Sequence, residues 1–182
     1  LGCQRFVGIG TCFEYDTSVG YLSEASPTRP RSLYAASKLA LQTMLEQLAG
    51  ISGMQVAWPR LFYQYGPFED EQRLVPSVMC ALLRGREVQL TAGHQVRDFL
   101  HVEDVASAIW AVSHSELTGP VNIGSGRPVT VRDIATKLGE LIGHPELLAF
   151  GALPYDKSDP MFVCANNHRL IEHTDWAPRW SL

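Results

Sequence analysis

Short apolar runs alternate along the chain with longer segments whose apolar residues recur at helical spacing. The run at 4–10 is mostly apolar and closes on glycine, which predicts a short strand buried on both faces. A loop rich in Ser, Thr, Pro and Gly follows at 11–32. Ser32 then offers an N-cap for a helix over 33–49.

Residues 55–62 predict the second strand. Pro59 within it predicts a bulge or a strand end nearby, because proline cannot donate to a sheet ladder. The same alternation of element types continues to the C-terminus. Helices are expected over 74–83, 103–113, 130–142 and 168–172, and strands over 88–91, 99–102, 121–123 and 147–150. Strands that alternate with helices in this way are typical of a mainly parallel α/β sheet.

The composition is that of an ordinary globular protein. Of the 182 residues, 46% are hydrophobic and 19% are charged, and the formal net charge is −4. This acidic balance does not favour nucleic acid or an anionic membrane surface, both of which attract a basic face. No apolar run approaches the roughly 20 residues of a membrane span. We therefore expect neither a nucleic-acid partner nor a membrane partner.

The cysteines suggest no metal and no disulfide framework. Cys3, Cys12, Cys80 and Cys164 lie far apart and form no C-x-x-C pair, so no metal site is expected. Buried free thiols in a reducing compartment are the favoured interpretation. Because no segment resembles a signal peptide, the cytoplasm is the expected location. The chain opens without Met and stops without a polar tail, so we expect both ends to be cut from a longer chain.

Three residues carry candidate chemistry. Tyr34 and Lys38 lie four residues apart on a predicted helix, which places both side chains on one face. An ammonium beside a phenol favours the phenolate, and such a tyrosine can give or take a proton at a carbinol or carbonyl oxygen. Thr11, after the preceding strand, can add a hydroxyl to the same oxygen. With a hydride acceptor such as NAD, the trio would interconvert an alcohol and a ketone. The bare spacing also fits a surface tyrosine beside a solvated lysine.

Six motifs follow one another in a fixed order. They are GTCFEY at 10–15, Tyr34-x-x-x-Lys38, RLFYQYGP at 60–67, LVP at 74–76, RDFLHVEDV at 97–105, and NIGSG at 122–126 with a Trp-Ala-Pro ending at 176–178. Each is modest alone, but in this order they resemble the extended short-chain dehydrogenase/reductases, in the NAD-dependent epimerase/dehydratase family of sugar nucleotides. The resemblance covers nearly the whole chain. The G-T-C-x-E-Y form is most similar to a branch near the 4-ketoreductases and 4-epimerases.

This resemblance implies a fold and a division of the chain. The expected α/β fold is the C-terminal part of a Rossmann-like, doubly wound parallel sheet with a small α/β substrate-binding subdomain. Residues 1–66 would hold the remaining half of the dinucleotide-binding domain with the catalytic trio. Residues 67–182 would form mainly the nucleotide-sugar subdomain, with some segments returning to the sheet. No G-x-G-x-x-G or G-x-x-G-x-x-G opens the chain, so the family's phosphate-binding loop is not among these residues.

The resemblance also implies a cofactor, a substrate and a role for each site residue. The cofactor would be NAD or NADP and the substrate a nucleoside-diphosphate sugar. Tyr34 would be the acid/base, Lys38 would bind the nicotinamide ribose, and Leu61 would lie against the cofactor. Thr11 would bind the sugar 4-oxygen, and Arg97 would grip the diphosphate, since a guanidinium fork matches phosphate geometry. Further substrate contacts are implied for Tyr63, Leu74, Val75, Val88 and Leu90. An exposed salt bridge is the alternative for the arginine, and core packing is the alternative for the aliphatic residues.

Two further expectations concern structure rather than chemistry. Three polar residues should fix loops and cap the following helix rather than react, namely Asp98, His101 and Asp104. A homodimer through the helix of Tyr34 and Lys38 is implied by the resemblance. Its candidate contacts, which core packing would explain equally well, are Leu41, Met44 and Leu48.

Departures from the family's patterns narrow the expected reaction. The family's 4,6-dehydratases carry an Asp-Glu pair directly after the catalytic Thr, and Cys12 and Phe13 stand there instead. Without that acid and base, dehydration lacks its catalysts. Tyr63 stands where the family has Asn, so the pocket must be reshaped. The expected function is an NAD(P)-dependent epimerase or 4-ketoreductase acting at C4 of the sugar, with a 4,6-dehydratase less favoured. Because the phosphate loop is missing from this stretch, a non-catalytic fragment or binding scaffold of the same fold is the alternative.

Overall fold

A computed structural model describes residues 2–182. Its central element is a four-stranded sheet of β1 (Arg5–Val7), β2 (Gly10–Thr11), β4 (Gln55–Leu61) and β9 (Gly119–Ile123). Strand β4 is the middle strand, with β1 and β2 on one side and β9 on the other. All of these pairings are parallel, as the alternation of strands and helices predicts.

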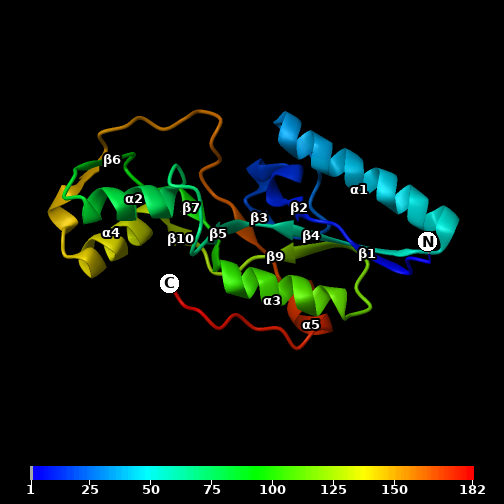
Figure 1. The fold of residues 1–182 in the computed structure, drawn as a ribbon. Helices are drawn as coiled ribbons and strands as arrows, with labels where there is room; N and C mark the ends of the chain where they lie inside the picture. The colour runs from blue at the N-terminus through cyan, green and yellow to red at the C-terminus, as the bar shows by residue number, and fades with distance from the viewer. Residues whose placement is uncertain (1) are drawn as a thin grey trace.

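Helices cover both faces of this sheet (Figure 1). Helix α1 (Leu33–Ser52) lies on one face, and α3 (Val102–Ser113) and α5 (His168–His173) lie on the other. The Ser32 hydroxyl accepts a backbone N–H of the first turn of α1, which is the predicted N-cap. The helix ends at Gly53, whose left-handed φ of 73° is one that glycine adopts without strain.

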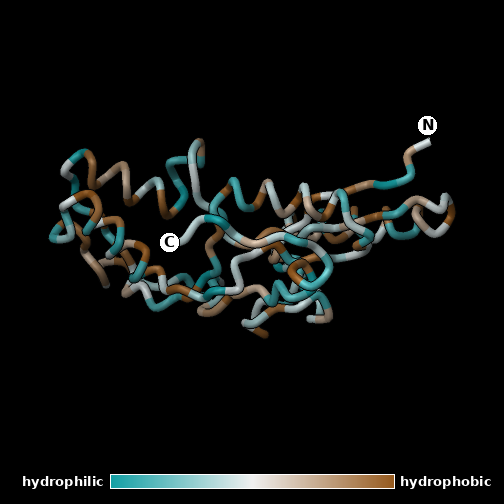
Figure 2. The backbone as a smooth tube through the Cα atoms, turned by 90° about the horizontal axis from the view of Figure 1, so that it is seen from below, coloured by the Kyte–Doolittle hydropathy of each residue, from teal (hydrophilic) through white to brown (hydrophobic). Residues whose placement is uncertain are grey.

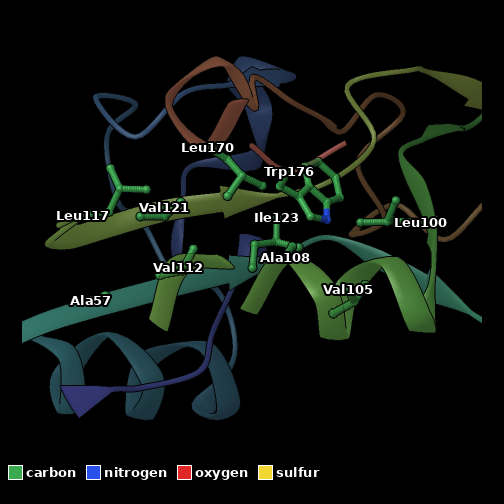
Figure 3. Close-up of a cluster of buried hydrophobic side chains, with 10 residues drawn as sticks. All are labelled: Ala57, Leu100, Val105, Ala108, Val112, Leu117, Val121, Ile123, Leu170 and Trp176. Carbon is green, nitrogen blue, oxygen red and sulfur yellow. The ribbon is translucent and has the colours of Figure 1, made fainter. Parts of the chain in front are cut away.

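The main apolar core lies between the sheet and the α3–α5 face (Figure 3). The side chains of β4 and β9 meet those of α3 there, and Leu170 of α5 and Trp176 close the cluster. The buried members are Ala57, Leu100, Val105, Ala108, Val112, Leu117, Val121, Ile123, Leu170 and Trp176. This cluster holds α3 and α5 on the face of the sheet opposite to α1.

A second lobe stands beside the sheet, at the left of Figure 1. Helices α2 (Leu74–Leu83) and α4 (Val131–Ile142) pack against each other. Strand β6 (Val88–Leu90) pairs in parallel with β11 (Leu148–Phe150). A separate apolar cluster, with Val78, Leu82, Leu90 and Ala135 buried, holds this lobe together.

Short strand pairs join the two parts. Strand β5 (Tyr63–Tyr65) pairs in parallel with β8 (Phe99–His101), and β3 (Tyr21–Leu22) pairs in parallel with β12 (Cys164–Ala165). The remaining short elements are β7 (Val96–Arg97), β10 (Val129–Thr130), and the 3₁₀ turns η1 (Cys12–Glu14), η2 (Thr17–Val19) and η3 (Pro145–Leu147). The strand predicted over 99–102 is confirmed as β8. The sequence did not predict β3, β5, β7, β10, β12 or the 3₁₀ turns, because they are too short to show a period.

The predicted helices and longer strands are confirmed to within a few residues, but the strand predicted at 4–10 is not one strand. It is split into β1 and β2, and Phe6 stays exposed, so burial on both faces is wrong. The indole of Trp58 lies against the break. A Cβ at Gly8 or Gly10 would come within 2.3 Å or 2.2 Å of that ring, so only glycine fits beside it.

The proline in β4 is accommodated by the same break. Pro59 pairs in register with Val121 of β9, and that ladder continues through it without the predicted bulge. Ala57 accepts a hydrogen bond from the Gly8 N–H at 3.0 Å on the β1 side. The backbone N–H and C=O groups of successive residues in a parallel strand point alternately to the two neighbouring strands. The nitrogen of Pro59 therefore points to the same side as the carbonyl of Ala57, into the gap between β1 and β2, where no acceptor is left without a partner by the missing N–H.

Apolar and polar residues are interleaved in both parts of the molecule, and the tube in Figure 2 changes colour at short intervals. Within residues 2–182, no helix combines the length and the apolar character that a bilayer span requires.

Candidate active site

A cavity of about 710 Å³ lies where the carboxyl ends of β2 and β4 meet the second lobe. Thr11 and Leu61 line it from the sheet, and Tyr34 lines it from the first turn of α1. The opposite wall comes from α2, β6 and β7. Ligands of open α/β sheets bind at this edge of the strands, so the cavity lies where the fold places a site.

The cavity gathers most of the residues that the sequence singled out. Thr11, Tyr34 and Leu61 are joined there by a set from the second half of the chain, namely Tyr63, Leu74, Val75, Leu90 and Arg97. Val88 does not line it. Val88 lies two residues before Leu90 in β6 and packs into the apolar cluster of the second lobe, so the alternative of core packing applies to it.

Thr11 is positioned by a capping box at the start of η1. Its hydroxyl accepts the Phe13 N–H at 3.4 Å, and its own N–H donates to Glu14 Oε1 at 2.9 Å. Because the Thr11 hydroxyl is the acceptor in this bond, its own hydrogen remains available to a ligand.

Tyr34 and Lys38 share one face of α1, as their spacing predicts. The Lys38 Nζ atom lies 5.9 Å from the centroid of the Tyr34 ring. It donates to the carbonyl of Ile9 at 2.9 Å, in the loop between β1 and β2. Lys38 therefore stands behind Tyr34, while the Tyr34 side chain is about half exposed in the cavity. A lysine ammonium carries three donors, so further acceptors can bind beside this tyrosine.

A buried polar network lies under this end of the site. The Glu14 carboxylate accepts from Arg60 Nε at 2.7 Å and from the Trp58 indole at 3.1 Å. Arg60 Nη2 donates to Gln42 Oε1 of α1 at 2.8 Å, and its guanidinium lies 4.2 Å from the centroid of the Tyr15 ring. All of these groups are buried and hydrogen-bonded, so the network fixes α1, η1 and β4 relative to one another.

The far wall of the cavity holds an arginine that already has a carboxylate partner. Arg97 Nη2 donates to Asp159 Oδ1 at 2.6 Å, and Nη1 donates to the Val96 carbonyl at 2.8 Å. The guanidinium lies 5.2 Å from the centroid of the Tyr63 ring. Burial raises the pKa of Tyr63 well above its ordinary value, although the charge of Arg97 acts in the opposite direction. This phenol therefore stays protonated near neutral pH and can donate.

Three polar residues have the structural roles that the sequence predicts. The Asp98 carboxylate accepts the backbone N–H groups of Ser125, Gly126 and Ala165 at 2.7–3.1 Å. The His101 imidazole accepts the N–H of residue 103 and caps α3. The Asp104 carboxylate accepts two N–H groups of the C-terminal segment, at 179 and 180.

The thiols are only partly as expected. Cys12 and Cys164 are buried, and burial raises the pKa of each to about 12. Cys80 is half-buried and Cys3 is exposed, so the prediction of burial is wrong for Cys3. Within the part of the chain that the structure describes, no group of three or more His, Cys, Asp and Glu side chains could hold a metal ion.

Sequence reasoning missed several polar residues of the cavity. They are Glu69, Gln72, Arg73, Gln89, Gln95 and Asp159. The first three follow the Gly-Pro breaker at 66–67, and a polar loop after a conspicuous motif could have drawn attention to them. Asp159 lies 62 residues from Arg97, and no local pattern connects the two.

Comparison with known proteins is consistent with this geometry. The profile of the NAD dependent epimerase/dehydratase family matches residues 1–124, and the chain belongs to this family. A UDP-glucose 4-epimerase of Corynebacterium glutamicum is 26% identical to it, over 97% of this chain and 59% of its own length.

Two solved structures show the same fold. A UDP-glucose 4-epimerase of Thermotoga maritima with UDP-glucose matches with a TM-score of 0.88 and 26% identity, over 99% of this chain and 60% of its own. A dTDP-glucose 4,6-dehydratase of Streptomyces venezuelae with NAD matches with a TM-score of 0.86 and 25% identity, over 100% and 57%. The chain thus spans about three fifths of the length of these relatives. The predicted Rossmann-like α/β fold is confirmed, while the division at residue 66 stays a prediction.

Proposed function

We propose that this chain is the catalytic and substrate-binding part of an NAD(P)-dependent enzyme that acts at C4 of a nucleoside-diphosphate sugar. The reaction is a 4-epimerisation or a 4-keto reduction. One observation carries the proposal: a single cavity has Thr11 and Tyr34 at one end and Arg97 on the facing wall. The family and the named substrates of its relatives support the same class.

The roles follow from the positions of the three residues. Tyr34, half exposed in the cavity, would give or take the proton of the sugar 4-oxygen. Thr11 would donate its hydroxyl hydrogen to that oxygen and hold it in place. Lys38 would favour the phenolate form of Tyr34 and offer its remaining N–H groups to the ribose hydroxyls of the cofactor. Leu61, which lines the cavity, would give the cofactor an apolar contact. The bound nicotinamide supplies the hydride acceptor and donor.

Arg97 and Tyr63 would receive the diphosphate. Two N–H groups of Arg97 are engaged by Val96 and Asp159, and the others remain for phosphate oxygens. The protonated phenol of Tyr63 beside it can donate to the same group, as the Asn of the family's motif would. Leu74, Val75 and Leu90 give an apolar wall for the nucleoside.

Dehydration is disfavoured by the residues beside Thr11. Cys12 is buried with its pKa raised to about 12, so it cannot act as a base near neutral pH. Phe13 lines the cavity but has no proton to exchange. A 4,6-dehydratase would need a carboxylic acid and a carboxylate at these two positions.

A ligand panel tests the proposed substrate class. The melting temperature of the full-length protein would be measured with UDP-, GDP-, CDP- and dTDP-sugars, each with NAD or NADP. A ligand at a hundred times its Kd stabilises the folded state by about 2.7 kcal/mol, so one sugar nucleotide should raise Tm clearly. If none of them shifts Tm in any combination, the proposal is wrong.

Tyr34→Phe tests the acid/base role. Loss of a positioned acid/base should lower kcat by about 10²–10⁴-fold with folding intact. Tyr21→Phe is the matched control, because Tyr21 is also about half exposed but lies outside the cavity. Equal turnover in the two variants would end the catalytic assignment. A protein that binds the sugar nucleotide tightly but never converts it would instead be the binding scaffold of the same fold.

The outer face of α1 supports a homodimer as part of this proposal. Leu41, Met44, Leu48 and Ile51 recur at helical spacing on that face and are all exposed. Met44→Lys with Leu48→Lys should convert a dimer of the full-length protein into a monomer in analytical ultracentrifugation. Leu141→Lys, an exposed leucine in the second lobe, is the control. An unchanged dimer in the double variant would refute this interface.

A further inference from the structure

We infer that Glu69 is a specificity-determining residue, whose carboxylate accepts a hydrogen bond from an O–H or N–H group of the bound nucleotide sugar. This inference rests on the proposed function. The sequence motifs do not single out Glu69, and its position in the cavity is the reason to consider it.

Glu69 lies in the loop between β5 and α2 and lines the main cavity. Its Oε2 atom is buried, yet it has no hydrogen-bond partner among the described residues. Buried polar atoms of folded proteins are nearly always hydrogen-bonded, so an acceptor that the protein leaves unpaired beside a ligand cavity indicates a partner that comes with the ligand, which the carboxylate meets by rotating toward the cavity.

The neighbouring acids of the same loop differ from Glu69. Asp70 accepts the N–H of residue 72 at 2.9 Å, which closes a turn within the loop. Glu71 is exposed and lies 3.6 Å from Arg84 on α2. Glu69 alone of these three lines the cavity. Its burial raises its pKa, and the nearby charge of Arg73 only partly opposes that shift.

The backbone beside Glu69 is also unusual. Phe68 has a φ of 68°, the one positive value of a non-glycine residue in the range 2–182, and its side chain is fully exposed. A residue other than glycine in this region carries strain, and such strain gathers at ligand-binding segments. The strained residue directly precedes the side chain that lines the cavity.

A carboxylate that lacks a partner selects for a donor. Hydroxyls of the sugar and the ribose, and N–H groups of the base, are all neutral donors that could meet Glu69. A ligand that lacks the donor would leave the carboxylate unpaired and bind more weakly, which is how polar sites discriminate between close analogues.

The test compares Glu69→Leu with Glu71→Gln in the full-length protein. Isothermal calorimetry would use UDP-glucose and UDP as probes. We expect Glu69→Leu to weaken UDP-glucose binding by roughly tenfold or more, because a hydrogen bond to a charged group is lost, and Glu71→Gln to leave it unchanged. An equal loss for UDP places the donor on the nucleotide, and a loss confined to UDP-glucose places it on the sugar. Unchanged affinity for both probes would overturn the inference while the proposed function stands.

A second measurement needs no ligand. If the carboxylate has no partner in the free protein, Glu69→Leu removes a desolvated orphan and raises Tm by about 2–4 °C. A lower Tm would show that the protein itself uses the carboxylate, and would overturn the inference independently. Should the wild-type protein bind no nucleotide sugar at all, the proposed function fails first and this inference fails with it.

Discussion

The two faces of the sheet are covered in different ways. Helix α3 presents Val105, Ala108 and Val112 to the main apolar cluster. Helix α1 is longer, but of its twenty described side chains only Ala35 and Gln42 are buried. Among the described residues, α3 is thus held by apolar burial, whereas α1 buries few side chains and adds polar contacts to its packing.

Those polar contacts join α1 to the strands at two points. Gln42 binds Arg60 of the Glu14 network, and Lys38 binds the carbonyl of Ile9. Polar groups fix a geometry through direction as well as distance, which suits a helix whose first turn must hold Tyr34 in place. Among the described residues, the helix that carries the proposed chemistry therefore has directional polar attachments, and the helix on the other face is attached through its apolar area.

The largest effect is expected from breaking the polar attachment. Glu14→Gln leaves the Arg60 charge buried without its counter-ion, which should lower the free energy of unfolding by about 3–5 kcal/mol. Urea denaturation followed by circular dichroism measures it. The double variant Glu14→Leu with Arg60→Met removes both charges and should lose less than Glu14→Gln alone. A double variant that is the less stable of the two would contradict this account.

The second largest effect comes from comparing a leucine-to-alanine substitution on the two faces of the sheet. Leu170→Ala opens a cavity in the main cluster and should cost about 2–5 kcal/mol of unfolding free energy. Leu48→Ala on the outer face of α1 should cost no more than about 0.5 kcal/mol in a monomer. Denaturant titrations at two protein concentrations would check both. A large, concentration-dependent loss for Leu48→Ala would show instead that a partner covers α1.

The smallest effect concerns the loop that leads into α1. The hydroxyl and backbone N–H of Ser18 lower the pKa of Asp16, and Arg29 and Arg31 lower it further. A lowered pKa means that the carboxylate contributes stability above its ordinary pKa, and that this contribution is lost as the pH falls through the lowered value. Asp16→Asn should therefore lower Tm at pH 7 by at most about 2 °C. The difference should vanish near pH 2, and a difference that persists there would exclude the charge as its cause.

Local patterns predicted the elements well where they were long. The apolar spacing and the Ser32 cap predicted α1, and β4 was found through its apolar run. The prediction of one strand at 4–10 failed because the Trp58 ring, far along the chain, occupies the place where the strand breaks. The exposure of Leu41, Met44 and Leu48 was also beyond the sequence, since the same spacing serves a core face and an open one.

The sequence by itself determined the family, the fold class and the face shared by Tyr34 and Lys38, because motif order and helical spacing are properties of the chain. Only the tertiary structure decided which polar groups meet. It paired Arg97 with Asp159 and Glu14 with Arg60, and it left one oxygen of Glu69 without a partner. The physical reason is that hydrogen bonds and burial depend on groups brought together from distant segments, and that meeting is set by how the elements pack.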